Sequence, residues 1–172
     1  PMNAIIGMID LLLETELNEE QEEYAGTVRS SADALLDILN DILDLSRVES
    51  GRLELESAAF DLRNIVEESV DLHAHKAHAK GIRLGCRIPP TLDGRYQGDA
   101  GRLRQVLLNL ISNAVKFTEN GEVQVAVDED TTAIGKRRLN FTVKDTGIGI
   151  QLELQRKIFE AFRQADGSMT RR

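Results

Sequence analysis

Residues 99–118 read DAGRLRQVLLNLISNAVKFT, and their pattern predicts a central helix with two different faces. At about 100° per residue, the aliphatic side chains gather on one side and predict a stripe that faces a core. The aliphatic stripe comprises Leu103, Val106, Leu107, Leu110, Ile111 and Ala114. The polar side chains on the other side are Arg102, Gln105, Asn109, Asn113 and Lys116.

The two asparagines of the polar face lie one turn apart in mid-helix, where asparagine is a poor helix former because its amide competes for backbone groups. Two interpretations are open. The face is either simply solvated, or it presents amide oxygens and an ammonium to an Mg-bound polyphosphate. Mg²⁺ prefers hard oxygen ligands, and lysine supplies a point charge for phosphate.

A second motif follows a predicted strand. Residues 139–144 alternate between apolar and polar side chains and lead into DTGIGI at 145–150. The carboxylate can accept a hydrogen bond from an exocyclic amine such as that of adenine, and the glycines allow close backbone approach or a positive φ. Alone, the glycine pair more commonly means a plain turn. Combined with the helix and the Phe-rich segment 158–162, it favours a nucleotide site.

This combination resembles the N, G1 and F boxes of sensor histidine kinases, within the gyrase-like ATPase superfamily. The resemblance implies ATP and Mg²⁺ as cofactors, bound by Asn109, Asn113, Lys116, Phe117, Asp145, Gly147 and Gly149. It assigns Mg²⁺ to Asn113, with Asn109 as a second candidate ligand, and phosphate to Lys116. It assigns the adenine amine to Asp145, the pocket wall to the two glycines, and packing near the base to Phe117.

The charge of the 172-residue chain is unevenly distributed. Residues 1–50 carry 12 acidic and 2 basic side chains, whereas residues 51–172 carry 17 and 19. This contrast predicts two domains, 1–51 and 52–172, and the acidic first half argues against nucleic acid binding. No apolar run approaches the ~18 residues of a membrane span, which predicts a soluble piece. The lone Cys86 cannot form an internal disulfide and is expected to fill the core.

The first 51 residues predict an antiparallel helical hairpin. Residues 1–15 carry a helical apolar stripe, and Asn18 is a suitable cap for the next helix. That helix keeps a seven-residue rhythm through Tyr24, Val28, Ser31, Leu35, Ile38, Ile42 and Leu45. Two helices cannot bury so broad a face, so we expect half of a dimeric four-helix bundle. The alternative is packing against the rest of the same chain.

The opening PMNAIIGM resembles the tail of the H box of the same family. The resemblance implies that the acceptor histidine lies upstream of Pro1, so that no catalytic residue lies within the chain. His73, His75 and His78 do not match an H box. Only His75 and His78 share an i, i+3 spacing, and no third ligand for this pair is evident nearby, so we expect a solvated helix end rather than a metal site.

Residues 52–172 predict an α+β fold. The expected elements are a strand within 52–60, a helix from Asp61 to Lys80 stopped by Gly81, a strand at 82–88, a loop through Gly98, the central helix, a hairpin of 123–127 and 139–143 with a polar turn at 130–136, and a helix at 152–162. The resemblance implies a Bergerat-type α/β sandwich with a mixed, mostly antiparallel sheet. It is expected to be incomplete, with a second glycine loop following Arg172. Phe159 and Phe162 belong either to the core or to the base of a lid.

The resemblance as a whole implies a fragment of a hybrid two-component sensor kinase, which transfers the γ-phosphoryl group of ATP to a histidine of the dimerisation helices. It implies a homodimer through 1–51, a response-regulator receiver domain as partner, and a cytoplasmic portion of a protein attached to the inner membrane. The fragment alone is expected to be inactive. Alternatives are a gyrase-like ATPase, which would carry a glutamate at Asn109, and a non-catalytic dimerisation scaffold. An aspartic protease, suggested by Asp145-Thr146-Gly147, disagrees with the long Leu-rich helices.

Overall fold

The computed structural model describes residues 2–130 and 138–155. The chain divides into two compact units, residues 1–54 and residues 55–172. Within the described ranges, no helix combines the length and apolar character needed to cross a lipid bilayer.

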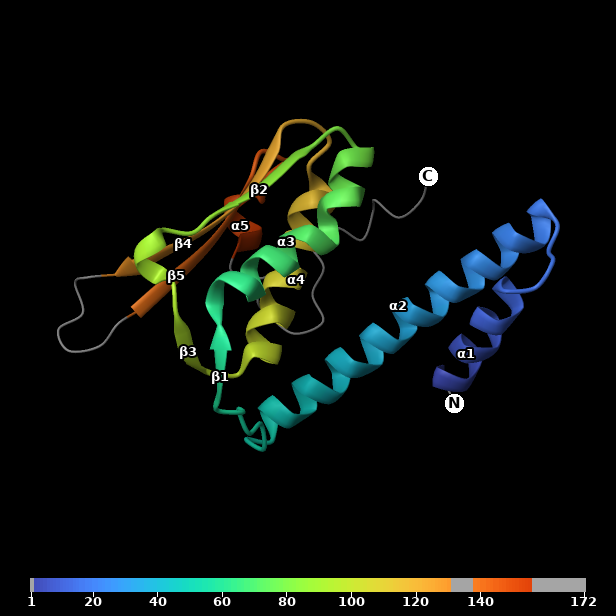
Figure 1. Cartoon of the computed structure of the whole chain (residues 1–172), viewed down its shortest axis with the longest axis horizontal. Helices are drawn as coiled ribbons and strands as arrows, with labels where there is room; N and C mark the ends of the chain where they lie inside the picture. The colour runs from blue at the N-terminus through green and yellow to red at the C-terminus, as the bar shows by residue number, and fades with distance from the viewer. Residues whose placement is uncertain (1, 131–137, 156–172) are drawn as a thin grey trace. The chain divides into compact units, whose positions relative to one another are not determined.

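The first unit is a helical hairpin of α1 (Met2–Leu13) and α2 (Glu19–Glu49) (Figure 1). Asn18 caps α2, because its side-chain oxygen accepts a hydrogen bond from the Gln21 backbone N–H at 2.9 Å. The Gln21 side chain accepts in return from the Asn18 N–H at 3.1 Å, which completes a capping box. The predicted start of this helix is confirmed.

The hairpin leaves most of its large apolar side chains in solvent. Within the described part of α1 and α2, its buried hydrophobic residues are Ile9, Ala25 and Ala32. The large exposed ones include Ile5, Met8, Leu11, Leu12, Tyr24, Val28, Leu35, Ile38, Leu39, Ile42 and Leu43. The two helices of the hairpin therefore leave most of the predicted seam uncovered between themselves.

The second unit is a two-layer sandwich in which α3 (Leu62–Ala79) and α4 (Ala100–Phe117) cover one face of a sheet (Figure 1). The strand order is β2-β4-β5, with β2 (Arg83–Arg87) parallel to β4 (Glu122–Asp130). β5 (Arg138–Asp145) pairs antiparallel with β4. The predicted α+β fold with a mixed sheet is confirmed.

β1 (Ala58–Asp61) and β3 (Arg95–Gly98) pair antiparallel and form a separate two-stranded sheet. The prediction of a loop through Gly98 is wrong for β3. Its sequence, RYQG, has a single large apolar side chain, so the strand forms through backbone pairing with β1 rather than through an alternating pattern.

Two short elements complete the described chain, the 3₁₀ helix η1 (Pro90–Leu92) and α5 (Leu152–Gln155). The remainder of the predicted helix 152–162, including Phe159 and Phe162, lies outside the described residues. Residues 131–136 of the predicted polar turn lie outside them as well.

The core lies between the helical layer and the sheet. Its most buried members, all at 0–1% exposure, are Leu62, Val66, Ala77, Leu92, Leu107, Ile111, Val115, Val123, Val125 and Val127. Val106 and Leu110 were predicted on the core-facing stripe of α4 but are 55% and 45% exposed. The apolar stripe of α4 is thus wider than the surface that α3 and the sheet cover.

Cys86 was predicted to fill the core, and this is wrong because the residue is exposed. It belongs to β2, an edge strand of the described sheet, so neighbouring backbone covers it on one side only. Partial desolvation raises the pKa of its thiol, and the carboxylates of Glu67 and Asp71 raise it further.

Candidate functional site

Asp99 fixes the start of α4, the helix that carries most of the predicted site. One carboxylate oxygen accepts a hydrogen bond from the Arg102 N–H at 2.9 Å, and the other accepts from the Glu56 N–H at 3.1 Å. The hydrogen bond from the Arg102 N–H contributes most to holding the pKa of Asp99 below its ordinary value, and the one from the Glu56 N–H contributes next. The helix therefore begins where its sequence predicts.

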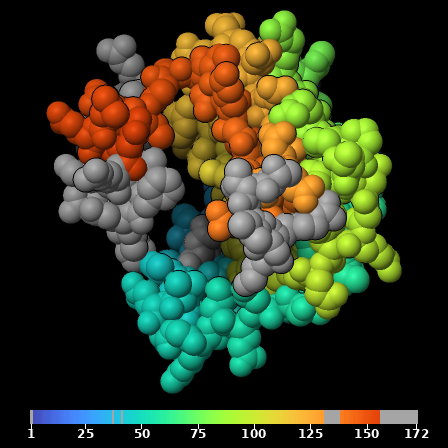
Figure 2. Space-filling model, turned by 90° about the vertical axis from the view of Figure 1, so that its left-hand side faces the viewer, coloured from blue at the N-terminus to red at the C-terminus, as the bar shows by residue number. Residues whose placement is uncertain are grey.

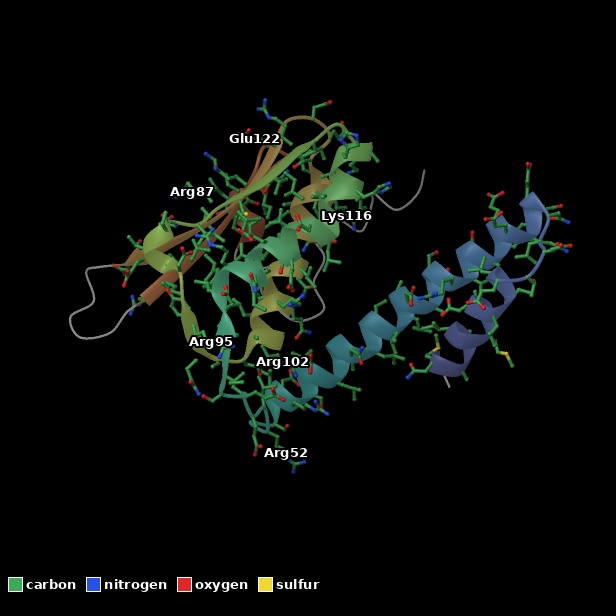
Figure 3. The ribbon with its side chains drawn as sticks, in the orientation of Figure 1. Arg52, Arg87, Arg95, Arg102, Lys116 and Glu122 are labelled. Carbon is green, nitrogen blue, oxygen red and sulfur yellow. The ribbon has the colours of Figure 1, made fainter. Side chains whose placement is uncertain are left out.

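Three of the five predicted polar residues of α4 lie exposed on one side of the helix. Asn109, Asn113 and Lys116 are exposed, and their spacing of four and three residues places them on successive turns. Phe117 follows at 46% exposure. The Lys116 ammonium lies 5.1 Å from the centroid of the Phe117 ring, within the range of a cation–π interaction. Figure 3 shows Lys116 and Arg102 at opposite ends of the helix.

The strand register brings the Asp-Thr-Gly loop to the same end of α4. Asp145, the last residue of β5, pairs with Val123 near the start of β4, and β4 begins shortly after α4 ends. Ile148 N–H then donates to the Phe117 carbonyl at 3.4 Å. In the space-filling view the orange-red residues after β5 lie against the ochre end of α4 (Figure 2). Motifs distant in sequence therefore meet.

Gly147 packs closely against the end of α4. A Cβ at this position would collide with the Phe117 carbonyl oxygen and lie 2.9 Å from the Phe117 carbonyl carbon. The neighbouring Asp145 carboxylate accepts a hydrogen bond from the Gly147 N–H at 2.8 Å, which folds the loop over its own first residue. Because Gly147 has no side chain, the loop can pack closely against the end of α4. Gly149 has a φ of 70°, a conformation that favours glycine.

Thr146, which is not among the predicted site residues, joins the same loop to the α4–β4 connection. Its hydroxyl accepts a hydrogen bond from the Glu122 N–H at 3.0 Å and has the Asn120 carbonyl within 3.3 Å as an acceptor. Gly121, with φ of 115°, leaves room for this hydroxyl, because a Cβ there would collide with it. A threonine directed at backbone groups has no distinctive sequence pattern, so no local signal could have identified it.

The histidines lie elsewhere, on α3. The His73 ring nitrogen Nδ1 lies 3.1 Å from the Ser69 carbonyl oxygen. His75 and His78 line a hollow of about 570 Å³ between the end of α3 and β2, together with Arg83. No predicted site residue lines this hollow. Among the described residues, no three His, Cys, Asp or Glu side chains gather into a cluster that could hold a metal ion.

The α4 face and its docked loop offer two kinds of chemistry side by side. Amide oxygens of Asn109 and Asn113 with the ammonium of Lys116 suit a hydrated divalent cation and anionic oxygens. Phe117 and Ile148, whose backbones are joined by a hydrogen bond, expose 46% and 67% of their apolar side chains, and with the Asp145 carboxylate of the same loop they suit a flat ring with a hydrogen-bond donor. The residues present thus fit a magnesium-bound nucleotide.

Comparison with known families assigns both units. The family described as "His Kinase A (phospho-acceptor) domain" matches residues 1–51. The family described as "Histidine kinase-, DNA gyrase B-, and HSP90-like ATPase" matches residues 98–172, which include α4 and the docked loop. The two matches together cover most of the chain.

Individual relatives cover the whole chain. It is 43% identical to the signal transduction histidine-protein kinase BarA of Escherichia coli K12 over 100% of its length, and 42% identical to the sensor protein GacS of Pseudomonas syringae pv. syringae over 99%. It spans 19% of the length of each.

Solved structures share the fold. The full-length ShkA structure, in complex with AMPPNP, has a TM-score of 0.76 and 39% identity, over 97% of this chain and 35% of ShkA. The histidine kinase ThkA, in complex with the response regulator protein TrrA, has a TM-score of 0.60 and 26% identity, over 95% of this chain and 47% of the matched one.

Proposed function

We propose that this chain, which belongs to the sensor histidine kinases, is the part of such a kinase that binds Mg-ATP. It would present the γ-phosphoryl group to a histidine of the dimerisation helices. The proposed domains are the helical hairpin, residues 1–51, and the ATP-binding domain, residues 52–172. The proposed acceptor histidine precedes Pro1, because PMNAIIGM resembles the tail of an H box.

One observation carries the proposal: the Asp145–Gly149 loop is docked on the end of the helix that bears Asn113 and Lys116. The Ile148–Phe117 hydrogen bond and the close packing of Gly147 hold the two motifs together. A solvated polar helix face would not require such docking. The docking therefore supports a binding role for that face.

Each predicted residue has a role that its position allows. Asn113 would hold Mg²⁺ through its amide oxygen, with Asn109 one turn earlier as a second oxygen donor for metal or phosphate. Lys116 would neutralise phosphate charge. Asp145 would accept from the adenine amine, while Phe117 would pack near the base. Gly147 and Gly149 shape the wall, the first by permitting contact with α4.

Phosphoryl transfer depends on positioning and charge neutralisation, with little covalent chemistry for the binding domain to perform. Bound Mg²⁺ would neutralise charge on the phosphate oxygens. The nucleophile would be a neutral imidazole nitrogen, which is available near physiological pH. This chain's residues would therefore orient the nucleotide rather than react with it.

The proposed partners follow from the same membership. The uncovered apolar seam of α1 and α2 supports a homodimer through residues 1–51. A receiver domain of a response regulator, on the same or another protein, would accept the phosphoryl group. We place this part of the protein in the cytoplasm, with attachment to the inner membrane through other segments.

A calorimetric titration with Mg-AMPPNP tests the proposal. Asn113→Asp should weaken binding at least about tenfold, because it changes the charge and the ligand geometry at the proposed metal position. Asn40→Asp makes the same chemical change at an exposed position of α2 and should leave the affinity unchanged. Equal affinities for the Asn113 variant and the unchanged chain would contradict the assignment.

A gyrase-like ATPase is the alternative for the second domain, since the matching family includes such proteins. The phospho-acceptor family match at residues 1–51 favours the kinase. An ATPase would release inorganic phosphate, whereas a kinase would form an acid-labile phosphoprotein once the acceptor histidine is included.

A further inference from the structure

Lys80 connects the end of α3 to the end of α4, where the candidate site is built. Its ammonium donates hydrogen bonds to the carbonyls of Val115 and Lys116, both at 2.9 Å, and to that of Thr118 at 3.4 Å. These carbonyls belong to the last turn of α4 and its cap, where the helix itself supplies no donors. A cation at this end also interacts favourably with the helix dipole.

The backbone of Lys80 is itself fixed, which gives its side chain a defined origin. Gly81 N–H donates to the His78 carbonyl at 2.9 Å, and Ile82 N–H donates to the Ala77 carbonyl at 2.9 Å. Gly81 has φ of 71°, as expected for the residue that ends a helix in this way. The turn after α3 therefore fixes the backbone position from which the Lys80 side chain reaches α4.

The carbonyls that Lys80 binds flank, in the sequence, the carbonyl that binds the docked loop. Between the Lys116 and Thr118 carbonyls lies that of Phe117, which accepts the Ile148 N–H. The last turn of α4 is thus held both by the ammonium of Lys80 and by the Asp145–Gly149 loop. Movement of this turn would displace Lys116, Phe117 and the loop together.

We propose that Lys80 is a positioning residue of the nucleotide site, acting through the carbonyls of Val115, Lys116 and Thr118 to hold the last turn of α4 in register with the Asp145–Gly149 loop. This inference rests on the proposed function. Lys80 faces backbone carbonyls and makes no contact with the nucleotide in this assignment.

Lys80→Met tests it, because methionine keeps an unbranched side chain but removes the ammonium. The matched control is Lys76→Met, one turn earlier on α3, since the described part of the chain shows no hydrogen bond or ion pair for Lys76. Lys80→Arg restores the charge and the donors, and Lys80→Gln serves as a second neutral variant if Lys80→Met does not fold.

Three measurements are made on each variant: the melting temperature, amide hydrogen exchange at Ile148, and the affinity for Mg-AMPPNP well below that melting temperature. The inference predicts about tenfold faster exchange and about tenfold weaker binding for Lys80→Met, with Lys80→Arg close to the unchanged chain and Lys76→Met identical to it. A lower melting temperature with unchanged affinity overturns the inference, because a purely structural lysine predicts that result.

The two hypotheses fail in different ways. If the unchanged chain bound no Mg-AMPPNP, the proposed function would fail, while hydrogen exchange would still decide whether Lys80 holds the loop. If the chain bound the nucleotide and Lys80→Met changed neither the exchange at Ile148 nor the affinity, the role of Lys80 would be wrong and the proposed function would stand.

Discussion

The two units of the chain differ in how far their large apolar side chains are buried. The second unit encloses aliphatic residues between helices and sheet, with Val66, Ile111 and Val125 fully buried. The first unit exposes its large apolar side chains, including Ile38 at 55% and Leu39 at 42%. One unit completes its core within the chain, and the other requires an additional apolar surface.

The two units should therefore respond to different perturbations. The stability of the second unit should depend on its own packing and be independent of protein concentration. The stability of the hairpin should rise with protein concentration, because association would supply the missing contacts. Four predictions test this contrast, ordered by decreasing expected effect.

Ile111→Ala should destabilise the second unit by about 2–5 kcal/mol, because it empties a fully buried position of the core. Denaturant unfolding followed by circular dichroism measures the change. The control is Val106→Ala on the same helix, which is 55% exposed and should cost less than about 1 kcal/mol. Similar costs for both variants would show that α4 is not packed as described.

Gly147→Ala should destabilise the second unit by about 1–3 kcal/mol and weaken nucleotide binding, because its Cβ would collide with the backbone of Phe117. Backbone cannot rotate away as a side chain can. Gly85→Ala provides the control, since a Cβ there meets no atom within 4 Å. Unfolding and calorimetric titration measure the two effects, and a neutral Gly147→Ala would argue against the docked loop.

Ile42→Glu should weaken self-association at least about tenfold, or about 1.4 kcal/mol, since it places a charge in the apolar seam of the hairpin. Analytical ultracentrifugation over a concentration series measures the dissociation constant. Asn40→Glu adds the same charge two residues away, on another side of α2, and should change association little. If both variants associated as the unchanged chain does, the seam would not be the dimer surface.

Acid should affect the helix caps of the two units differently. Folding lowers the pKa of Asp99, so its charge stabilises the second unit above the unfolded value of about 4, and this stabilisation is lost as the pH falls further. Asn18 caps α2 without a charge. Thermal melting from pH 7 to pH 3 should therefore show a weaker pH dependence of the second unit in Asp99→Asn, and an identical dependence would contradict this role.

Much of the fold could be predicted from the sequence, because its signals are local. Asn18, Asp61 and Asp99 mark helix starts through hydrogen bonds that span three residues, and the structure contains each of them. The periodicity of α4 and the alternation of β5 also depend on near neighbours alone. The pairing of β1 with β3 does not, which is why β3 was missed.

The candidate site was predictable in part. The side chains of Asn109, Asn113 and Lys116 follow a helical repeat that can be read from the sequence. Thr146 and Lys80 could not be found, because both act on the backbone of distant residues, and any sequence supplies carbonyl and N–H groups. Periodicity also could not distinguish Leu110 from Leu107, since coverage depends on neighbouring layers.

β4 and β5 separate the two parts of the candidate site in the sequence, so the ribosome synthesises these parts in a fixed order. The amide-bearing helix leaves the exit tunnel first, and the whole β4–β5 hairpin must follow before Gly147 can reach the Phe117 carbonyl. A nascent chain that stops short of β5 would carry the proposed phosphate-binding residues of α4 without the loop that is proposed to hold the base. A nucleotide bound as proposed could therefore assist only the final stage of co-translational folding.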